Sequence, residues 1–298
     1  MNHGRNQGHI AALRAMLKTE RGILVPGAPN ALAAAIIADL GFRAIYLTGA
    51  GLTNMNLGLP DLGFLNLSQI VEHTMAIRGI TDRPLIVDAD TGFGNALNVT
   101  HTVTMLERAG ASAIQLEDQS SPKRCGHFAG KDLVSTAEMV GKIKAAVDAR
   151  REDIVVVART DARATEGFEA AIERAQSYLE AGADMTFVEA PETLDEVRAI
   201  PARLAAPQML NMVVGGRTPM VGRTTAAAMD FSLILYANAA LQGAIQGMQA
   251  ALRSLRETGG LDEADGLVAS FAERQRLVNK AAYDELERRY AAAGRKAP

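Results

Sequence analysis

Short apolar segments alternate with Ala-rich helical patterns from about residue 21 to residue 245. The apolar residues in each segment are continuous instead of alternating with polar ones, which is typical of parallel strands buried on both faces. The expected strands cover residues 22–25, 44–47, 84–87, 113–116, 154–157, 185–188, 208–210 and 231–235. Eight strands separated by helices predict an α/β fold of the closed (β/α)8 type, a TIM barrel.

A repeated glycine supports this count of strands. Gly41, Gly110 and Gly182 each follow a helical segment and lie six residues before the last aliphatic residue of the next strand. Glycine is favoured just after a helix, where a positive φ costs it little. A doubly wound open sheet is the rival architecture, but no Gly-x-Gly-x-x-Gly follows the first expected strand.

The sequence contains no linker or low-complexity segment, which favours a single domain. We expect one domain over residues 1–298, with the barrel at about 21–245 and a helical extension at about 246–298. Apolar residues in the extension recur at roughly helical spacing, so it should pack on the barrel wall or on a neighbouring subunit. These residues are Leu267, Val268, Phe271, Leu277 and Val278.

Composition narrows the class of protein. Hydrophobic residues make up 48% and charged residues 22%, with a formal net charge of −3. This is a globular composition that gives no electrostatic reason to expect nucleic-acid or membrane-surface partners. One cysteine and 12 methionines suit a reducing compartment. With no apolar run long enough to span a bilayer and no apolar N-terminal core, a cytoplasmic protein is expected.

Carboxylates follow several of the expected strands, where a barrel of this type carries its chemistry. Asp88 and Asp90 follow the third strand and Glu117 follows the fourth. Gathering negative charge on one rim is costly unless a cation neutralises it, and oxygen ligands favour Mg²⁺, or Mn²⁺, over zinc. The alternative is that these acids cap helices or pair with Lys and Arg side chains.

Arg159, after the fifth strand, is a candidate clamp for a substrate carboxylate, because its planar guanidinium binds a carboxylate through two hydrogen bonds. A structural ion pair with Asp161 or Glu189 is the alternative.

The loop after the fourth strand contains the cysteine, Cys125, next to Lys123, Arg124 and His127. Positive neighbours lower the pKa of a thiol and make it a usable acid or base near neutrality. His127 could orient Cys125 or contact the substrate. The alternative is a buried, inert thiol.

These residues lie in stretches that resemble the isocitrate lyase/phosphoenolpyruvate mutase superfamily over about residues 20–250. The matching stretches are residues 46–51, 59–63, 87–94, 114–119, 122–127 and 158–162. The Lys-Arg-Cys-Gly-His loop is a specific signature of the lyase branch. The resemblance implies a (β/α)8 barrel whose last helix is exchanged between subunits, usually in a homotetramer.

The same resemblance implies roles for individual residues. Asp88 and Asp90 would hold Mg²⁺, with Glu117 completing the metal site directly or through water. Cys125 would lie on a gating loop with Gly126 and His127. The implied substrate-binding residues, some of them next to the substrate and not in direct contact with it, are Thr48, Gly49, Ala50, Asp61, Gly126, Arg159, Glu189 and Asn211.

The implied reaction is a retro-aldol cleavage of a 2-hydroxy di- or tricarboxylate, of the 2,3-dimethylmalate or 2-methylisocitrate type, to an α-keto acid and a second carboxylate. Cys125 would be the general acid, with Glu117, Arg159 and His127 as further catalytic residues, while the general base stays unassigned. Gln242 and Val214 replace the arginine and glutamate of 2-methylisocitrate lyases, which favours a dicarboxylate. The alternatives are phosphonate chemistry, oxaloacetate decarboxylation, or a metal-binding protein without activity.

Overall fold

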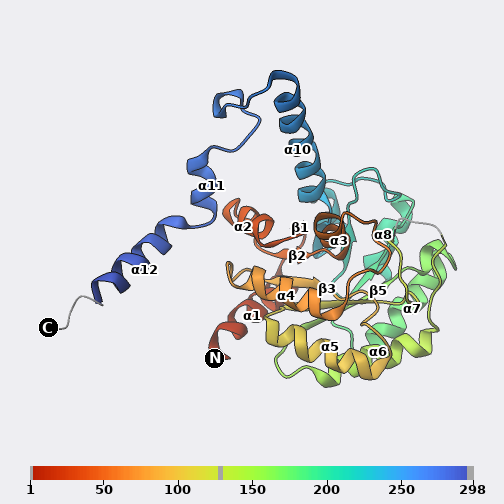
Figure 1. Ribbon diagram of the computed structural model, residues 1–298. Helices are drawn as coiled ribbons and strands as arrows, with labels where there is room; N and C mark the ends of the chain where they lie inside the picture. The colour runs from red at the N-terminus through yellow and green to blue at the C-terminus, as the bar shows by residue number, and fades with distance from the viewer. Residues whose placement is uncertain (1–2, 127–129, 294–298) are drawn as a thin grey trace. The chain divides into compact units, whose positions relative to one another are not determined.

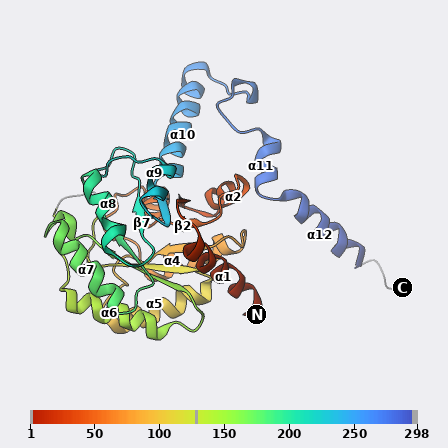
Figure 2. The same ribbon diagram turned by 180° about the vertical axis from the view of Figure 1, so that it is seen from behind.

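The computed structural model describes residues 3–126 and 130–293. By their contacts these residues divide into two compact units, Met1–Leu241 and Gln242–Pro298. The first unit contains every strand of the described chain, and Figures 1 and 2 show these strands at its centre with helices around them.

The strands form one eight-stranded parallel sheet in the order β6-β5-β4-β3-β2-β1-β8-β7. A parallel bridge between Thr186 and Gln208 joins β6 to β7, so the sheet closes on itself. The predicted (β/α)8 barrel is therefore confirmed, with every expected strand observed within two residues of its predicted start. The strands are β1 Ile23–Ala28, β2 Ile45–Leu47, β3 Leu85–Asp88, β4 Ala113–Glu117, β5 Val155–Thr160, β6 Met185–Val188, β7 Met209–Asn211 and β8 Leu233–Tyr236.

Helices follow the strands along the chain. Asn30, Asn66 and Asn95 begin three of them as N-caps, each side chain accepting a backbone amide hydrogen bond from the first turn. The helices of the first unit are α1 His3–Thr19, α2 Ala31–Asp39, α3 Gly49–Leu57, α4 Leu67–Arg78, α5 Ala96–Ala109, α6 Thr136–Ala149, α7 Phe168–Glu180, α8 Leu194–Arg203 and α9 Arg223–Ala228. The next helix, α10 (Ala239–Thr258), begins at the end of the first unit.

The repeated glycines have the predicted backbone conformation. Gly41, Gly110 and Gly182 have φ values of +83°, +97° and +105°, in the left-handed region that a side chain would strain. They follow α2, α5 and α7 and precede strands β2, β4 and β6, as the spacing of the repeat predicts.

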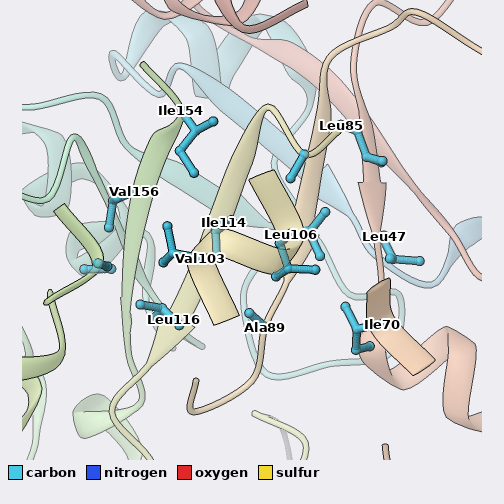
Figure 3. Close-up of a cluster of buried hydrophobic side chains, with 14 of the residues drawn as sticks. Leu47, Ile70, Leu85, Ala89, Val103, Leu106, Ile114, Leu116, Ile154 and Val156 are labelled. Atoms are coloured by element: carbon cyan, nitrogen blue, oxygen red, sulfur yellow. The ribbon is translucent and has the colours of Figure 1, made fainter. Parts of the chain in front are cut away.

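Side chains inside the barrel and outside it alternate along each strand. In β3, Ile86 points into the barrel interior, while Leu85 and Val87 belong to the outer layer between strands and helices. Figure 3 shows part of this outer layer, in which Leu85, Ile114 and Val156 of the sheet lie near residues of α5. Helix α1 adds three apolar side chains to the interior cluster, namely those of Leu13, Met16 and Leu17.

The second unit is helical, but the helical spacing predicted from Leu267 to Phe271 is wrong. It continues α10 and adds a 3₁₀ turn at Glu263–Asp265, α11 Phe271–Leu277 and α12 Lys280–Ala293. Leu267 and Val268 lie in a bend between the 3₁₀ turn and α11, not in a helix with Phe271. Gly266, with φ of +68°, ends the 3₁₀ turn, and the Ser270 side chain caps the start of α11. No helix in the part of the chain that the structure describes is long and apolar enough to cross a bilayer.

Candidate active site

The inward-pointing positions of the strands lead to one cavity at the carboxyl ends of the strands. Because inward side chains alternate with outward ones, Tyr46 of β2 is followed two residues later by Thr48, and Ile86 of β3 by Asp88. Polar side chains therefore replace apolar ones at the carboxyl ends of the strands. The cavity is lined by Tyr46, Thr48, Ala50, Asp61, Asp88, Lys123, Cys125, Gly126, Arg159, Phe187, Glu189, Asn211, Val213, Leu235, Ala237 and Asn238.

The turn from β2 into α3 brings backbone amides to the cavity. Thr48 is the N-cap of α3 and its hydroxyl accepts a hydrogen bond from the Gly51 amide at 3.2 Å. The Gly49 amide donates to Asp88 Oδ2 at 3.3 Å. A Cβ on Gly49 would lie 3.1 Å from that oxygen, so this close approach of the backbone favours glycine. Anions are favoured at helix N-termini, which fits the expected carboxylate site at Thr48, Gly49 and Ala50.

The three predicted metal ligands are all buried at the ends of β3 and β4. Asp88 Oδ1 accepts hydrogen bonds from the Gln115 amide side chain at 3.3 Å and from the Asp90 backbone amide at 3.2 Å. Neither oxygen of Glu117 has a hydrogen-bond partner among the described residues, although Arg159 Nε lies 3.5 Å from Oε2. Burial raises the pKa of the Glu117 carboxyl well above its usual range, and burial likewise raises that of Asp90.

Lys123 neutralises part of this negative charge. Its Nζ lies 2.7 Å from Asp61 Oδ1 and 2.9 Å from Asp90 Oδ1, and all three side chains are buried. Burial alone would lower the pKa of the Lys123 ammonium, but the surrounding carboxylates, Asp90 foremost, raise it well above its usual range. The ion pairing that the sequence left open as an alternative for the strand-end acids is therefore present for Asp90.

The remaining unpaired oxygens fit a hydrated divalent cation. No three His, Cys, Asp or Glu side chains of residues 3–126 and 130–293 form a group that could hold a metal ion together. Mg²⁺, however, usually keeps several waters and binds through one or two carboxylates. The unpartnered oxygens of Glu117 beside Asp88 offer acceptors for such waters, and an unsatisfied buried carboxylate is costly without them.

Arg159 is surrounded by carboxylates at the end of β5. Its Nε and Nη2 donate to both oxygens of Asp161 at 2.9 and 3.1 Å, and Nη1 lies 3.2 Å from Glu189 Oε2. Its guanidinium also lies over the Phe187 ring, 5.2 Å from the ring centre. Burial alone would lower the pKa of Arg159, but the carboxylates of Asp161, Glu189 and Glu117 raise it well above its usual range. Arg159 is therefore a charged side chain on the cavity wall. The alternative of structural ion pairs is thus realised at a side chain that also lines the cavity.

The thiol of Cys125 is half-buried and lines the cavity. The Cys125 amide donates to the Asp61 carbonyl at 3.2 Å. The Gln119 side chain holds Arg124, accepting from its amide at 2.9 Å and donating to its carbonyl at 2.8 Å. Cys125 therefore does not lie buried in the core. His127, predicted to act beside it, lies outside the described residues.

Glu189 and Asn211 complete the cavity wall at the ends of β6 and β7. Asn211 Nδ2 donates to Glu189 Oε2 at 3.5 Å, a long hydrogen bond. Asn211 Oδ1 has no hydrogen-bond partner in the described part of the chain. The structure thus brings most of the predicted residues to the wall of one cavity. Gly49, Asp90 and Glu117 do not line it, but they contact Asp88, Lys123 and Arg159, which do.

Tyr46, Lys131 and Phe187 belong to the site but were not identified as candidates from the sequence. Tyr46 and Phe187 line the cavity, and Tyr46 donates to Gln115 Oε1 at 2.7 Å. Strand alternation could have found both, because each lies two residues before a candidate, Thr48 and Glu189. Lys131 does not line the cavity but pairs with Asp161 at 2.7 Å, and no spacing rule predicts that contact.

Comparison with known proteins places this geometry in a family. The family model described as phosphoenolpyruvate phosphomutase matches residues 13–256. The chain is 42% identical over 285 residues to 2,3-dimethylmalate lyase of Eubacterium barkeri, covering 94% of this chain and 98% of that protein. It is 41% identical over 285 residues to 2-methylisocitrate lyase of Aeropyrum pernix, covering 96% and 91%.

A solved structure of a family member agrees with the fold. The crystal structure of phosphonopyruvate hydrolase with oxalate and Mg²⁺ has a TM-score of 0.86 and 34% identity, covering 95% of this chain and 99% of that one. The family model spans most of the chain, and the lyases match it over nearly their whole length. The chain therefore belongs to the isocitrate lyase/phosphoenolpyruvate mutase superfamily, as an enzyme of its carbon–carbon lyase branch.

Proposed function

We propose that this enzyme is a Mg²⁺-dependent lyase that cleaves a 2-hydroxy dicarboxylate of the 2,3-dimethylmalate type to an α-keto acid and a second carboxylate. One observation carries the proposal: Asp88, Cys125 and Arg159 line the same cavity. Such a site combines a ligand for a hard cation, a proton donor and a carboxylate clamp, and a retro-aldol cleavage needs all three.

Different residues of the chain would bind the anionic groups of the substrate and the metal ion. Arg159 offers its guanidinium to one carboxylate, and Ala50, in the first turn of α3, lines the cavity where the positive end of the helix favours another anionic group. Asp88 and Asp90 would hold Mg²⁺, with Glu117 accepting from its waters. When bound there, Mg²⁺ would act as a Lewis acid and template for the hydroxy-carboxylate end of the substrate.

Cleavage then requires two proton transfers. A base removes the proton of the 2-hydroxyl, the bond between C2 and C3 breaks, and the electron pair moves into the departing fragment as an aci-carboxylate. The Cys125 thiol donates its proton to the carbon of that fragment, which leaves as the second carboxylate. Cys125 lines the cavity, so its thiol can face a substrate that is bound there.

The charge of the cavity favours two substrate carboxylates over three. Among the described residues that line it, the cationic side chains are Lys123 and Arg159. Lys123 is paired with Asp61 and Asp90, and Arg159 with Asp161 and Glu189, so neither of these two cations is left over for an additional carboxylate. A third carboxylate would lie in the cavity without a charged partner, at a cost of about 1–3 kcal/mol or more.

The proposal is tested by measuring keto-acid release from 2,3-dimethylmalate, 2-methylisocitrate and oxaloacetate, and phosphate release from phosphonopyruvate, with Mg²⁺ and with EDTA. We expect Mg²⁺-dependent turnover with kcat/KM for 2,3-dimethylmalate about tenfold or more above that for 2-methylisocitrate. A preference for the tricarboxylate would contradict the substrate class. Turnover of phosphonopyruvate alone would contradict carbon–carbon cleavage between two carboxylate fragments.

We further propose that the enzyme works in the cytoplasm as a homotetramer. The single cysteine suits a reducing compartment. Helix α10 carries apolar side chains on one face, and Ile245, Met248 and Leu252 are exposed in the single chain. Covering such a face with another copy would remove apolar surface from water.

A further inference from the structure

Lys131 is a fully buried lysine that contacts both the loop that carries Cys125 and Asp161 at the end of β5. Its side chain is 1% exposed. The ammonium Nζ donates to the Gly126 carbonyl at 2.5 Å and to Asp161 Oδ1 at 2.7 Å. A buried lysine without such partners would be costly, so these two contacts fix where its ammonium lies.

Asp161 transmits this contact to the arginine of the cavity. Its Oδ1 accepts from both Lys131 Nζ and Arg159 Nη2, and its Oδ2 accepts from Arg159 Nε. The Asp161 backbone amide donates in turn to Asp118 Oδ1 at 2.9 Å. One carboxylate oxygen is therefore shared by the lysine that binds the loop and the guanidinium that faces the substrate.

The loop lies directly against that guanidinium. A Cβ added to Gly126 would lie 2.3 Å from Arg159 Nη2 and 2.6 Å from Glu189 Cγ. On the other side of Cys125, its own amide is held by the Asp61 carbonyl. The carbonyl of Gly126, the residue after Cys125, is thus held by Lys131, while the amide of Cys125 itself is held by Asp61.

We propose that Lys131 is a positioning residue that sets the Cys125 thiol relative to Arg159, so that the proton donor and the carboxylate clamp keep one geometry. This inference rests on the proposed function for its catalytic consequence, but the anchoring itself can be measured without substrate. A lysine that merely neutralised Asp161 would stabilise the fold without governing the reactivity of the thiol.

The test uses the fact that the chain contains one cysteine, so alkylation by iodoacetamide reports Cys125 alone. We compare Lys131→Met with the wild type and with Lys142→Met. Lys142 is also buried and donates to a carbonyl, that of Thr91, at 3.2 Å, but it does not touch the loop. Losing a charged hydrogen bond should loosen the loop and speed alkylation about tenfold or more in Lys131→Met only.

Turnover supplies the second readout. We expect kcat of Lys131→Met to fall about 100-fold while Mg²⁺ affinity is unchanged, since misplacement by about 1 Å costs about that much. Lys131→Arg, which keeps the charge, should recover part of both losses. An alkylation rate of Lys131→Met equal to that of the wild type would overturn the proposal, whatever happens to turnover.

Two further outcomes are decided by the same measurements. If the wild type proves inactive, the proposed function fails, but the alkylation rates still decide the role of Lys131. If Lys131→Met does not fold, judged by circular dichroism, Lys131→Gln and Lys131→Arg are compared instead. Faster alkylation of the glutamine variant supports the anchor, and equal rates of the two variants overturn it.

Discussion

Among single residues, the proposed reaction depends most on Cys125, its proton donor. Replacing the thiol with the much weaker acid of a hydroxyl in Cys125→Ser should lower kcat by about 10²–10⁴, the usual contribution of a general acid. Steady-state rates measure the change, and circular dichroism with a Mg²⁺ titration checks that the fold and metal site are kept. Turnover near that of the wild type would refute the role of the thiol.

A second residue-scale prediction concerns the metal. Asp88→Asn removes the charge of a carboxylate that lines the cavity, and should weaken Mg²⁺ binding at least about 100-fold, measured by calorimetry without substrate. Asp153→Asn is the matched control, because Asp153 is 70% exposed and pairs with Arg14 away from the cavity. Equal Mg²⁺ affinity of Asp88→Asn and the control would remove Asp88 from the metal site.

The sequence identifies the residues at the strand ends but not their pairing. Asp88, Glu117 and Arg159 could be found because a barrel brings the carboxyl ends of its strands together. The partners of Lys123 and Lys131 lie 62 and 30 residues away, and those contacts depend on how long side chains fold back into the interior. Neither hydrophobic periodicity nor motif spacing carries that information.

At the scale of elements, α1 is held to the barrel partly through a buried histidine. His9 Nδ1 lies 2.8 Å from Ser112 Oγ, and Nε2 has no hydrogen-bond partner among the described residues. Burial, with a smaller contribution from the charge of Arg78, lowers the pKa of His9 from 6.5 to about 4. The folded protein therefore keeps this imidazole neutral at pH values where the unfolded chain protonates it.

The pH dependence of stability follows from that difference. Above pH 6.5 the full contribution is present, and it is lost as the pH falls toward 4, because the unfolded state binds the proton first. Between pH 7 and pH 4 the free energy of unfolding of the wild type should therefore fall by up to about 3 kcal/mol more than that of His9→Gln, whose side chain cannot titrate. Urea unfolding at several pH values measures this, and parallel curves for the two proteins would contradict it.

The strands could be predicted from the sequence, but the helices of the second unit could be predicted only in part. Continuous aliphatic runs mark the strands because both faces of the barrel wall are buried. In the second unit, the apolar spacing from Leu267 to Phe271 resembles a helix. However, Gly266 and the Ser270 cap interrupt it, and polar local hydrogen bonds decide the boundary there instead of apolar burial.

At the scale of the whole molecule, assembly should depend on the apolar face of α10. Leu252→Glu places a charge on that face and should shift the protein from four times 31.6 kDa toward smaller species in sedimentation. Gln246→Glu adds the same charge to the same helix, away from that face, and should leave the mass unchanged. A wild type that sediments as a single chain would refute the proposed tetramer.

In the proposed reaction, one cavity breaks a carbon–carbon bond and returns a proton from a fixed thiol. Its most direct test is cleavage of 2,3-dimethylmalate in D₂O with Mg²⁺, followed by NMR of the products. We predict pyruvate together with propionate that carries one deuterium at C2 in a single configuration, because the thiol exchanges with solvent and delivers from one side. Propionate deuterated without stereochemical preference would rule out proton delivery from a fixed thiol, and the absence of both products would rule out the cleavage itself.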